Sequence, residues 1–355
     1  MQLGILGLPK SGKTTLFNTL TASHQATDKF ASSGQTNMGT ATVRDSRLEQ
    51  LRDLFHPKRY VPATVQYVDI PGIKRGESAE SIDLGKLKMV DALVNVVRAF
   101  DDPEILHSEG SVDPARDVEM LDLELILADH ELVERRIERL DKAVKRGLSP
   151  EEQKETALRS DVILKALEAE KPLREVELDA DDERRLRGFQ LLSAKPVLVV
   201  INSGEDRAAA DPAVFGVTQK TGTRVVVVSA PIEQEISQLP PDEQKEFLAD
   251  LGLSAPSLDR VTRASYDLLG LISFFTVGED EVRAWTIRRG TPARAAAGTI
   301  HSDIERGFIR AEVVRSDDLL RLKTMAACQK AALLRLEGKE YVMQDGDVAH
   351  FRFNV

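Results

Sequence analysis

Short apolar stretches alternate with polar or amphipathic stretches over the first hundred residues. The apolar stretches include QLGIL, TVQYVDI and DALVNVVRAF, and GKTTLFNTL between the first two predicts a helix. Such alternation is typical of a parallel sheet whose strands are joined by crossover helices. The pattern resumes at Lys195 with PVLVVIN and RVVVVSA. We therefore expect one discontinuous α/β domain that comprises residues 1–113 and 194–271.

A different periodicity fills the interval between these two parts, residues 114–193. A long charged stretch runs from Pro114 to about Gly147, and Ser149-Pro150-Glu151-Glu152 then restarts a helix, with serine as N-cap, proline in the first turn and glutamate closing a capping box. Lys171-Pro172 ends this second helix. Two antiparallel helices joined by a tight turn are the expected result, an inserted helical hairpin. The apolar positions that recur at threes and fours in the first helix are Val118, Leu121, Leu125, Leu132, Ile137, Leu140 and Val144.

The tail, residues 272–355, has a third character. SFFTV, VRAWTI and GFIRAEVV predict strands, SDDLLRLKTMAACQKAALL predicts one main helix, and YVMQDGDVAHFRFNV predicts two strands around a turn. Strands interleaved with one main helix in so short a segment predict a small α+β domain.

Composition narrows the class of protein. The chain has 355 residues, 42% of them hydrophobic and 30% charged, which is an ordinary globular balance. The apolar runs are too short to span a bilayer, and Met1 leads directly into a strand, which leaves no room for a signal peptide. The single cysteine, Cys328, excludes an internal disulfide framework and fits a reducing, cytoplasmic location. The net charge of −10 argues against a protein that binds DNA or another nucleic acid through a bulk positive field, and leaves a local basic patch open.

The segment Gly7-Leu8-Pro9-Lys10-Ser11-Gly12-Lys13-Thr14 matches the phosphate-binding loop GxxxxGK[ST] between a strand and a helix. Its backbone N–H groups and the helix N-terminus favour phosphate oxygens. Lys13 is expected to reach the β and γ phosphates and the Thr14 hydroxyl to ligate Mg²⁺. The predicted nucleotide-binding positions in this loop are Pro9, Lys10, Ser11, Gly12, Lys13, Thr14 and Thr15.

Asp69-Ile70-Pro71-Gly72 follows the strand TVQYV and matches a DxxG motif. Asp69 is expected to hold the Mg²⁺ shell and the Gly72 N–H to sense the γ-phosphate. The next residue is Ile73, where switch proteins often place a glutamine that orients water. Isoleucine neither donates nor accepts a hydrogen bond, so hydrolysis is arranged by another group or is slow.

The segment Ile201-Asn202-Ser203-Gly204-Glu205-Asp206 stands where guanine-nucleotide switch proteins carry Asn-Lys-x-Asp. Glu205 is one methylene longer than the aspartate that accepts two hydrogen bonds from guanine, and Ser203 lacks the lysine stem that packs over the base. Asn202 offers a donor and an acceptor that suit either purine. These residues indicate a weakened selectivity for guanine, but they do not by themselves indicate that adenine is preferred. Ser229-Ala230 lies one strand later, and an Ala230 N–H would suit the O6 acceptor of guanine.

Taken together, these segments resemble the Obg-like ATPase family of the YchF type. The similarity extends over essentially the whole chain, through GLPKSGKTTLFNTLT, the block from VDALVNVVRAF to HELVERR, LLSAKPVLVVINSGED, and the tail from FFTVGEDEVRAWTIRRGT to HFRFNV. The resemblance implies an α/β P-loop domain with an inserted antiparallel helical coiled coil and a C-terminal TGS domain of β-grasp fold. It also implies ATP as the preferred nucleotide, hydrolysed to ADP and phosphate, and association with the ribosome.

The chain departs from the family pattern at two places. Lys10 stands where the family usually has asparagine. In the first switch, aligning Asn37-Met38-Gly39 places Ser33 where the Mg²⁺-sensing threonine is expected, with Thr36 as the second candidate. We predict Thr14, Ser33 and Asp69 as metal ligands. Lys13, Lys10 and Gly72 are the predicted catalytic positions, with Lys10 placing a cation near the phosphates or merely adding to the field of the loop.

Three functions stay open at this stage. One is a ribosome-associated ATPase that acts as a translation-linked or stress-linked switch. The second is a GTPase with a degenerate base loop. The third is a ribosome-binding module gated by nucleotide, with negligible hydrolysis. Cations near the tip of the hairpin form either a patch for ribosomal RNA or a solvated face, because glutamates interleave with them. These cations are Arg135, Arg136, Arg139, Lys142, Lys145 and Arg146. A second candidate patch in the tail comprises Arg283, Arg288 and Arg289.

Overall fold

The computed structural model describes residues 1–21, 37–71, 84–143, 149–253 and 255–354. The chain divides into two compact units. The first comprises Met1–Thr40 and Gln66–Ala264, and the second comprises Ala41–Val65 and Ser265–Val355. The sequence pattern predicts a different division, in which residues 41–65 and 265–271 belong to the nucleotide-binding domain and the hairpin is a domain of its own.

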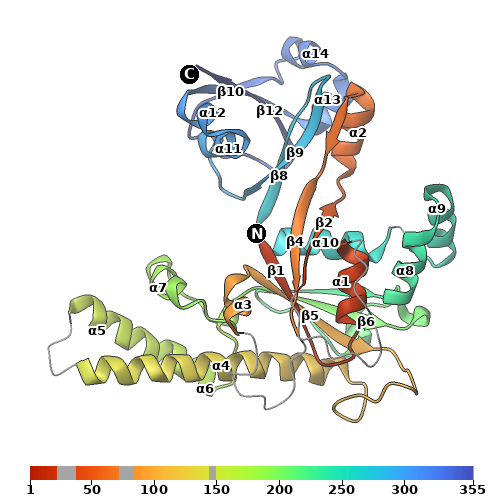
Figure 1. Cartoon of the computed structure of the whole chain (residues 1–355). Coiled ribbons are helices and arrows are strands. Elements are labelled where there is room, and N and C mark those ends of the chain that lie inside the picture. Colours follow the sequence, from red (N-terminus) through yellow and green to blue (C-terminus); the bar gives the residue numbers. More distant parts are fainter. Residues whose placement is uncertain (22–36, 72–83, 144–148, 254, 355) are drawn as a thin grey trace. The chain divides into compact units, whose positions relative to one another are not determined.

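A six-stranded sheet forms the centre of the first unit, with the strand order β2-β4-β1-β5-β6-β7 (Figure 1). β1 pairs in parallel with β4 and β5, and β5, β6 and β7 continue in parallel, which confirms the predicted crossover sheet. β5 and β6 are buried along their whole length, so they are rich in valine and show no polar alternation. The strands are β1 (Gln2–Leu6), β2 (Asn37–Val43), β4 (Ala63–Asp69), β5 (Ala92–Ala99), β6 (Val197–Ser203) and β7 (Thr223–Val228).

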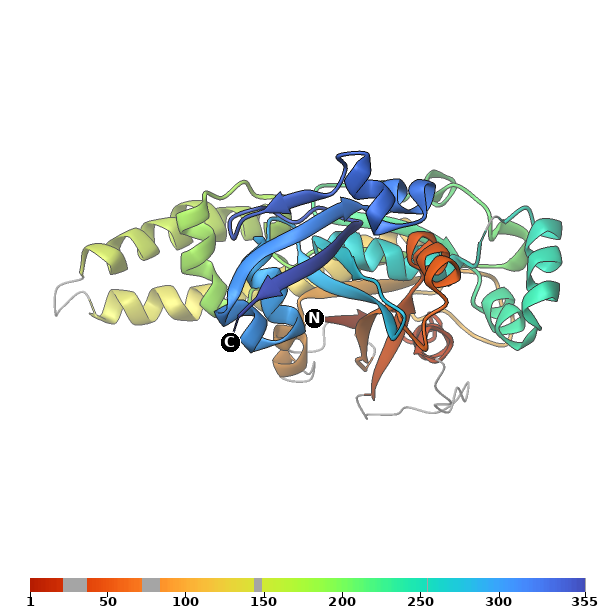
Figure 2. The ribbon, with the colours of Figure 1, turned by 90° about the horizontal axis from the view of Figure 1, so that it is seen from above.

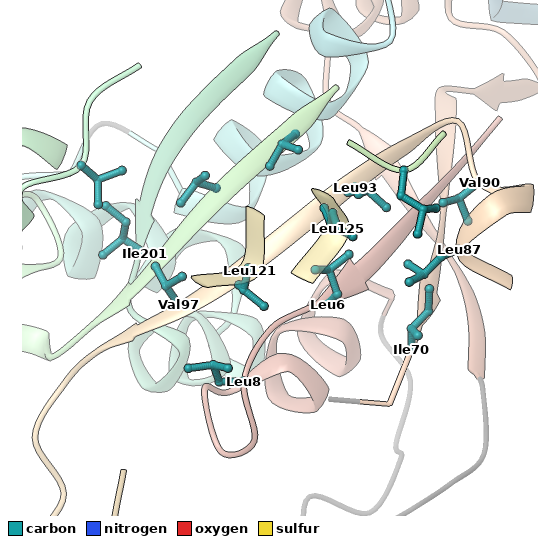
Figure 3. Close-up of a cluster of buried hydrophobic side chains, with 14 of the residues drawn as sticks. Leu6, Leu8, Ile70, Leu87, Val90, Leu93, Val97, Leu121, Leu125 and Ile201 are labelled. Atoms are coloured by element: carbon teal, nitrogen blue, oxygen red, sulfur yellow. The ribbon is translucent and has the colours of Figure 1, made fainter. Parts of the chain in front are cut away.

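Helices flank this sheet and bury its apolar side chains. In Figure 3, Leu121 and Leu125 of α4 lie against Leu93 and Val97 of β5, and all four are essentially inaccessible. Burying such side chains stabilises the fold by roughly 1.5–3 kcal/mol each. The helices of this unit besides the hairpin are α1 (Lys13–Thr21), α3 (Leu84–Met89), α8 (Ala230–Gln238), α9 (Pro241–Asp250) and most of α10 (Ser257–Leu268).

The inserted hairpin starts with α4 (Pro114–Ala143), a helix of 30 residues. Its return arm comprises α5 (Pro150–Ala157), a π-helical stretch (Leu158–Leu164) and α6 (Lys165–Glu168), and the two arms lie side by side in Figures 1 and 2. The predicted capping box is confirmed, because Ser149 and Glu152 exchange side-chain to backbone hydrogen bonds. The predicted stop at Gly147 lies outside the described residues.

The regularly spaced apolar residues of α4 are buried in two different hydrophobic cores. Leu121 and Leu125 face the sheet, whereas Leu132 and Ile137 pack against the return arm, together with Val133. Beyond the return arm, Leu173–Glu175, α7 (Ala180–Leu186) and Arg187–Phe189 lead the chain back to β6. None of the described helices is long and apolar enough to cross a membrane.

A mixed sheet of six strands forms the second unit, in the order β11-β10-β12-β8-β9-β3. Its core includes Phe274, Ile287, Val313 and Phe351, and small alanines of α11 pack against them. The strands are β3 (Arg59–Val61), β8 (Leu271–Thr276), β9 (Glu281–Arg288), β10 (Phe308–Arg315), β11 (Arg335–Glu337) and β12 (Asp347–Phe353). The helices are α2 (Ser46–Phe55), α11 (Ala293–Ile300), α12 (Ser302–Arg306), α13 (Ser316–Leu322) and α14 (Met325–Lys330).

The prediction of one main helix in the tail was wrong. The segment 316–330 breaks into α13 and α14, because Lys323 adopts a left-handed conformation with φ of 65° and Thr324 caps the next helix. The alanine-rich α11 and the short α12 were not predicted. The first of the two predicted closing strands is reduced to a single bridge between Val342 and Pro292.

A charged network fixes α2 within the second unit. Arg47 donates hydrogen bonds to both carboxylate oxygens of Asp45 and to Asp345, and its guanidinium lies over the ring of Phe275. Asp345 in turn accepts the N–H of Ser273 in β8. The segment Ala41–Val65 is therefore tied to the second unit by side chains as well as by the pairing of β3 with β9.

Candidate nucleotide-binding site

The phosphate loop follows β1, and its glycines are required by close backbone approaches. A side chain at Gly7 would meet the carbonyl oxygen of Val96 in β5 at 2.3 Å, and one at Gly12 would meet Nδ2 of Asn202 at 2.2 Å. Both glycines also have positive φ angles, 153° and 94°. The loop is therefore packed against β5 and β6. The backbone of Val96 leaves no room for a side chain at Gly7, and the Asn202 amide would have to move to admit one at Gly12.

Lys13 and Asp69 form the charged centre of the site. Lys13 Nζ donates a 2.9 Å hydrogen bond to the carbonyl oxygen of Leu8, so its ammonium is held inside the loop. Burial lowers the pKa of Lys13 to about 8, against the attraction of Asp69. Burial also raises the pKa of Asp69, against the effects of Lys13 and of Thr14, whose hydroxyl lies 3.4 Å from the carboxylate. For both charges desolvation outweighs their mutual attraction.

Thr14 and Asp69 suit a magnesium ion. Their oxygens are hard donors that lie 3.4 Å apart at the ends of α1 and β4. Mg²⁺ is usually held by one or two protein oxygens together with phosphates and water, so a dense cage of side chains is not needed. In the described part of the chain no group of three or more His, Cys, Asp and Glu residues could hold a metal ion.

Asn202 joins the base loop to the phosphate loop. Its Nδ2 donates to the carbonyl oxygen of Ser11 at 3.0 Å, and its Oδ1 accepts the N–H of Ala230 at 3.2 Å. The residue is 4% exposed, so the amide is committed on both sides to protein partners. The Ala230 N–H, which sequence analysis offered to guanine O6, is therefore occupied by Asn202.

The other predicted residues of the base loop differ from one another in burial and in hydrogen bonding. Ser203 is fully buried, and its hydroxyl lies within hydrogen-bonding distance of two carbonyl oxygens, Gly204 at 3.2 Å and Val228 at the end of β7 at 3.4 Å. Glu205 is exposed at the start of the short helix Glu205–Arg207. Ser229 caps α8 without a side-chain hydrogen bond, and its buried hydroxyl has no partner among the described residues.

Lys10 occupies the exposed tip of the phosphate loop. It has a φ of 64°, the left-handed region that costs roughly 1–2 kcal/mol for residues with a β-carbon. Its side chain is exposed. The backbone conformation is one that asparagine or glycine adopts with less strain, so a lysine at this position is held there by the loop around it.

The structure brings together most of the residues that sequence analysis assigned to the site. Lys13, Thr14 and Asp69 meet through the contacts described above, and Thr15 follows in α1 with Pro9 half-buried in the loop. Ser33, the predicted third metal ligand, and Thr36 lie outside the described residues. So do Gly72, the predicted γ-phosphate sensor, and Ile73.

Arg98, near the carboxyl end of β5, is not among the residues predicted from the sequence. It pairs in register with Asn202, and its guanidinium donates to the carbonyl oxygens of Phe100, Asp102 and Ile105. The sequence signal was a lone cation in an apolar strand followed by the acidic turn FDDPE. A charge in a strand that is otherwise buried calls for dedicated partners.

The parallel sheet, the glycine-constrained phosphate loop and the Thr14–Asp69 pair define a P-loop nucleotide-binding protein. Two family models match the chain. One, described as 50S ribosome-binding GTPase, covers residues 2–146, and YchF-GTPase_C, described as a protein of unknown function (DUF933), covers residues 271–354.

Known proteins resemble the chain over its full length. It is 44% identical to the ribosome-binding ATPase YchF of Bacillus subtilis, with 99% of each chain covered. It is 37% identical to Obg-like ATPase 1 of Oryza sativa, with 100% of this chain and 92% of the relative covered. The solved structure of the Schizosaccharomyces pombe YchF GTPase matches with a TM-score of 0.85 at 33% identity, over 99% of this chain and 97% of the other. The chain belongs to the YchF family, which confirms the resemblance seen in its sequence.

Proposed function

We propose that this chain is a ribosome-associated ATPase that hydrolyses ATP to ADP and phosphate in a translation-linked or stress-linked switching cycle. The observation that carries the proposal is the tie between Ser11 and Asn202, which joins an intact phosphate loop to an altered base loop. The relative from Bacillus subtilis is named a ribosome-binding ATPase, whereas the Schizosaccharomyces pombe relative is named a GTPase. The names of the relatives differ in the nucleotide, so the preference of this chain is inferred from its base loop.

Three features of the base loop support ATP. The Ala230 N–H is bonded to Asn202 and is not available to guanine O6. Ser203 is buried against Val228 and offers no stem to cover a base. Glu205 must bend back to accept the two guanine hydrogen bonds that an aspartate accepts, and such charge-assisted bonds contribute roughly 1.5–3 kcal/mol each. Loss of both hydrogen bonds lowers the affinity for guanine nucleotides by a factor of about 100 or more.

In the proposed site, Lys13 holds the β and γ phosphates, and the backbone from Pro9 to Thr15 surrounds them. Thr14 and Asp69 hold Mg²⁺, and Ser33 is the proposed third protein ligand. When bound, Mg²⁺ neutralises the charge shared by the phosphates. The ammonium of Lys13 has three N–H donors, so it can keep its hydrogen bond to the Leu8 carbonyl oxygen while it donates to phosphate oxygens.

Lys10 and Gly72 complete the proposed catalytic set. Lys10 lies at the exposed tip of the phosphate loop, where its flexible stem allows the ammonium to approach charge that develops between the β and γ phosphates. This role corresponds to that of an arginine finger supplied in cis. The Gly72 N–H is proposed to sense the γ-phosphate.

The proposed domains follow the sequence prediction. Residues 114–193 act as a coiled-coil arm, and residues 272–355 form a TGS domain of β-grasp fold, supported by a mixed sheet whose one face is covered by α11. Ribosome contact is proposed at the hairpin. Arg135 is paired with Glu131 at 2.8 Å and Arg136 with Glu155 at 3.1 Å, so RNA phosphates would compete with these acids. In the tail, the guanidinium of Arg283 lies 3.9 Å from the centre of the Trp285 ring, and the patch to which it belongs is the second candidate.

A second function, a nucleotide-gated ribosome-binding module with negligible hydrolysis, is favoured by Ile73 alone. Steady-state phosphate release from ATP, with and without ribosomes, distinguishes the two. The proposal predicts slow release that ribosomes accelerate at least several-fold. Release no faster than that from an Asp69→Asn variant under both conditions would leave the binding module as the function.

A further inference from the structure

Arg98 is a buried cation whose hydrogen bonds all go to one short loop. It is 3% exposed, and it donates to the carbonyl oxygens of Phe100 at 3.0 Å, Ile105 at 2.9 Å and Asp102 at 3.3 Å. Its guanidinium also lies 4.6 Å from the centre of the Phe100 ring. Burying a guanidinium is unfavourable unless its N–H groups are bonded, so these bonds hold the cation and the loop in one arrangement. We call the segment 100–105 the β5 loop.

The order of the strands places the β5 loop at the nucleotide site. β5 lies between β1, which leads into the phosphate loop, and β6, which leads into the base loop. Gly7 is packed against Val96 of β5, and two residues further along the strand Arg98 is level with Asn202. Ligands of parallel sheets bind beyond the carboxyl ends of the strands, where these three loops start.

The β5 loop begins next to the residues of β6 that lead into the base loop. Ala99, the last residue of β5, is level with Ser203 in the register of the two strands. All three guanidinium nitrogens of Arg98 are already engaged by loop carbonyls. Arg98 therefore acts through the loop, in contrast to an arginine that contacts phosphate directly.

We propose that the β5 loop walls the base-and-ribose end of the nucleotide site and that Arg98 is the positioning residue that fixes this wall. The inference rests on the proposed function for the presence of a nucleotide. It adds a residue that sets affinity for the nucleoside part without taking part in the chemistry at the phosphates. Its consequence is a split: loss of Arg98 raises the KM for ATP and leaves kcat unchanged.

The test compares two ligands in the full-length protein, ATP with Mg²⁺ and inorganic tripolyphosphate with Mg²⁺. Tripolyphosphate has the phosphates but no nucleoside. Arg98→Met keeps the length of the side chain and removes its donors, and it is expected to weaken ATP at least tenfold while changing tripolyphosphate less than twofold. Arg98→Lys keeps the positive charge and restores a single donor nitrogen, so its affinity for ATP should lie between those of Arg98→Met and the unmodified protein. kcat at saturating ATP should stay within twofold of the unmodified protein.

Hydrogen exchange in the unmodified protein gives a second readout that needs no variant. Backbone amides of the β5 loop should become protected by ATP and not by tripolyphosphate. The proposal would be overturned if Arg98→Met lost affinity for ATP and tripolyphosphate equally. It would also be overturned if ATP did not slow hydrogen exchange in the β5 loop. If the protein proves to prefer GTP, the same comparison with GTP still tests the β5 loop, so failure of the nucleotide assignment is distinguishable from failure of this inference.

Discussion

The amide nitrogen of Asn202 lies 3.0 Å from the carbonyl oxygen of Ser11, so a residue 191 positions along the chain holds the phosphate loop in place. The same amide accepts the N–H of Ala230. One side chain thus fixes three segments that a nucleotide would touch: the phosphate loop, the end of β6 and the start of α8. The position and size of this amide also determine which residues fit beside it.

Gly12→Ala should weaken nucleotide binding, because a β-carbon there would lie 2.2 Å from Nδ2 of Asn202 and force the amide off Ser11. We expect a loss of about 10- to 100-fold in ATP affinity, on the order of one or two hydrogen bonds. Titration calorimetry measures it.

Gly110→Ala is the matched control for this change. Gly110 also has a positive φ, 80°, but a β-carbon there would meet nothing within 4 Å. The control should lose some stability and keep its ATP affinity. Similar losses of affinity in both variants would show that backbone strain, and not the contact with Asn202, is responsible.

Replacing both Ser203 by lysine and Glu205 by aspartate should move the preference towards GTP. The shorter carboxylate accepts two hydrogen bonds from guanine and the lysine stem covers the base. We expect the ratio of ATP to GTP affinity to fall at least tenfold, measured by competition with a fluorescent nucleotide. Glu235→Asp, on the exposed side of α8, is the control. An unchanged ratio in the double variant would remove the base loop from the account of specificity.

Lys10→Ala should slow ATP turnover while ATP affinity stays within a few-fold, because the proposed cation acts on charge that develops during the reaction. An ammonium group only donates and cannot ligate a metal ion, so turnover of the unmodified protein should not change when Na⁺ is replaced by K⁺ at constant ionic strength.

Lys10→Asn relieves the left-handed strain and supplies an oxygen ligand, so its turnover should respond to potassium. Strong stimulation of the unmodified protein by potassium would mean that Lys10 is not the cation at the phosphates.

Reversing Arg135, Arg136 and Arg139 to glutamate should weaken ribosome binding and flatten its dependence on salt, because fewer counterions are released. Sedimentation with ribosomes over a range of salt concentrations measures both. The control reverses Arg52, Lys58 and Arg321, exposed cations of the second unit, which makes the same change in net charge. If only the control weakens binding, the contact lies outside the hairpin.

The parts of the site that follow from short motifs could be predicted from the sequence. A strand, a GxxxxGK[ST] loop and a helix fix where Lys13 and Thr14 lie, and a second parallel strand beside the first brings Asp69 to the same edge. The role of Asn202 in holding Ser11 depends on β5 lying between β1 and β6, which no local pattern records. Arg98 was overlooked for a different reason, since its partners are backbone carbonyls of the loop that follows it, and a sequence does not show where backbone carbonyls point.

Local signals also misled where the tertiary structure overrode them. The run from Ser316 to Lys330 is rich in Leu, Ala, Lys and Arg, which favour a helix, yet Lys323 adopts the left-handed conformation and Thr324 caps a new helix. β3 is only three residues long, too short for a periodic signal, and it is a strand because it pairs with β9 of the second unit. Tertiary pairing, and not propensity, decides such segments.

The central claim is that this chain selects ATP, and the dissociation constants of ATP and GTP, measured side by side with Mg²⁺ by titration calorimetry, test it most directly. With the Ala230 N–H bonded to Asn202 and Glu205 in place of aspartate, we predict that ATP binds at least tenfold more tightly than GTP. GTP binding that equals or exceeds ATP binding would contradict the account.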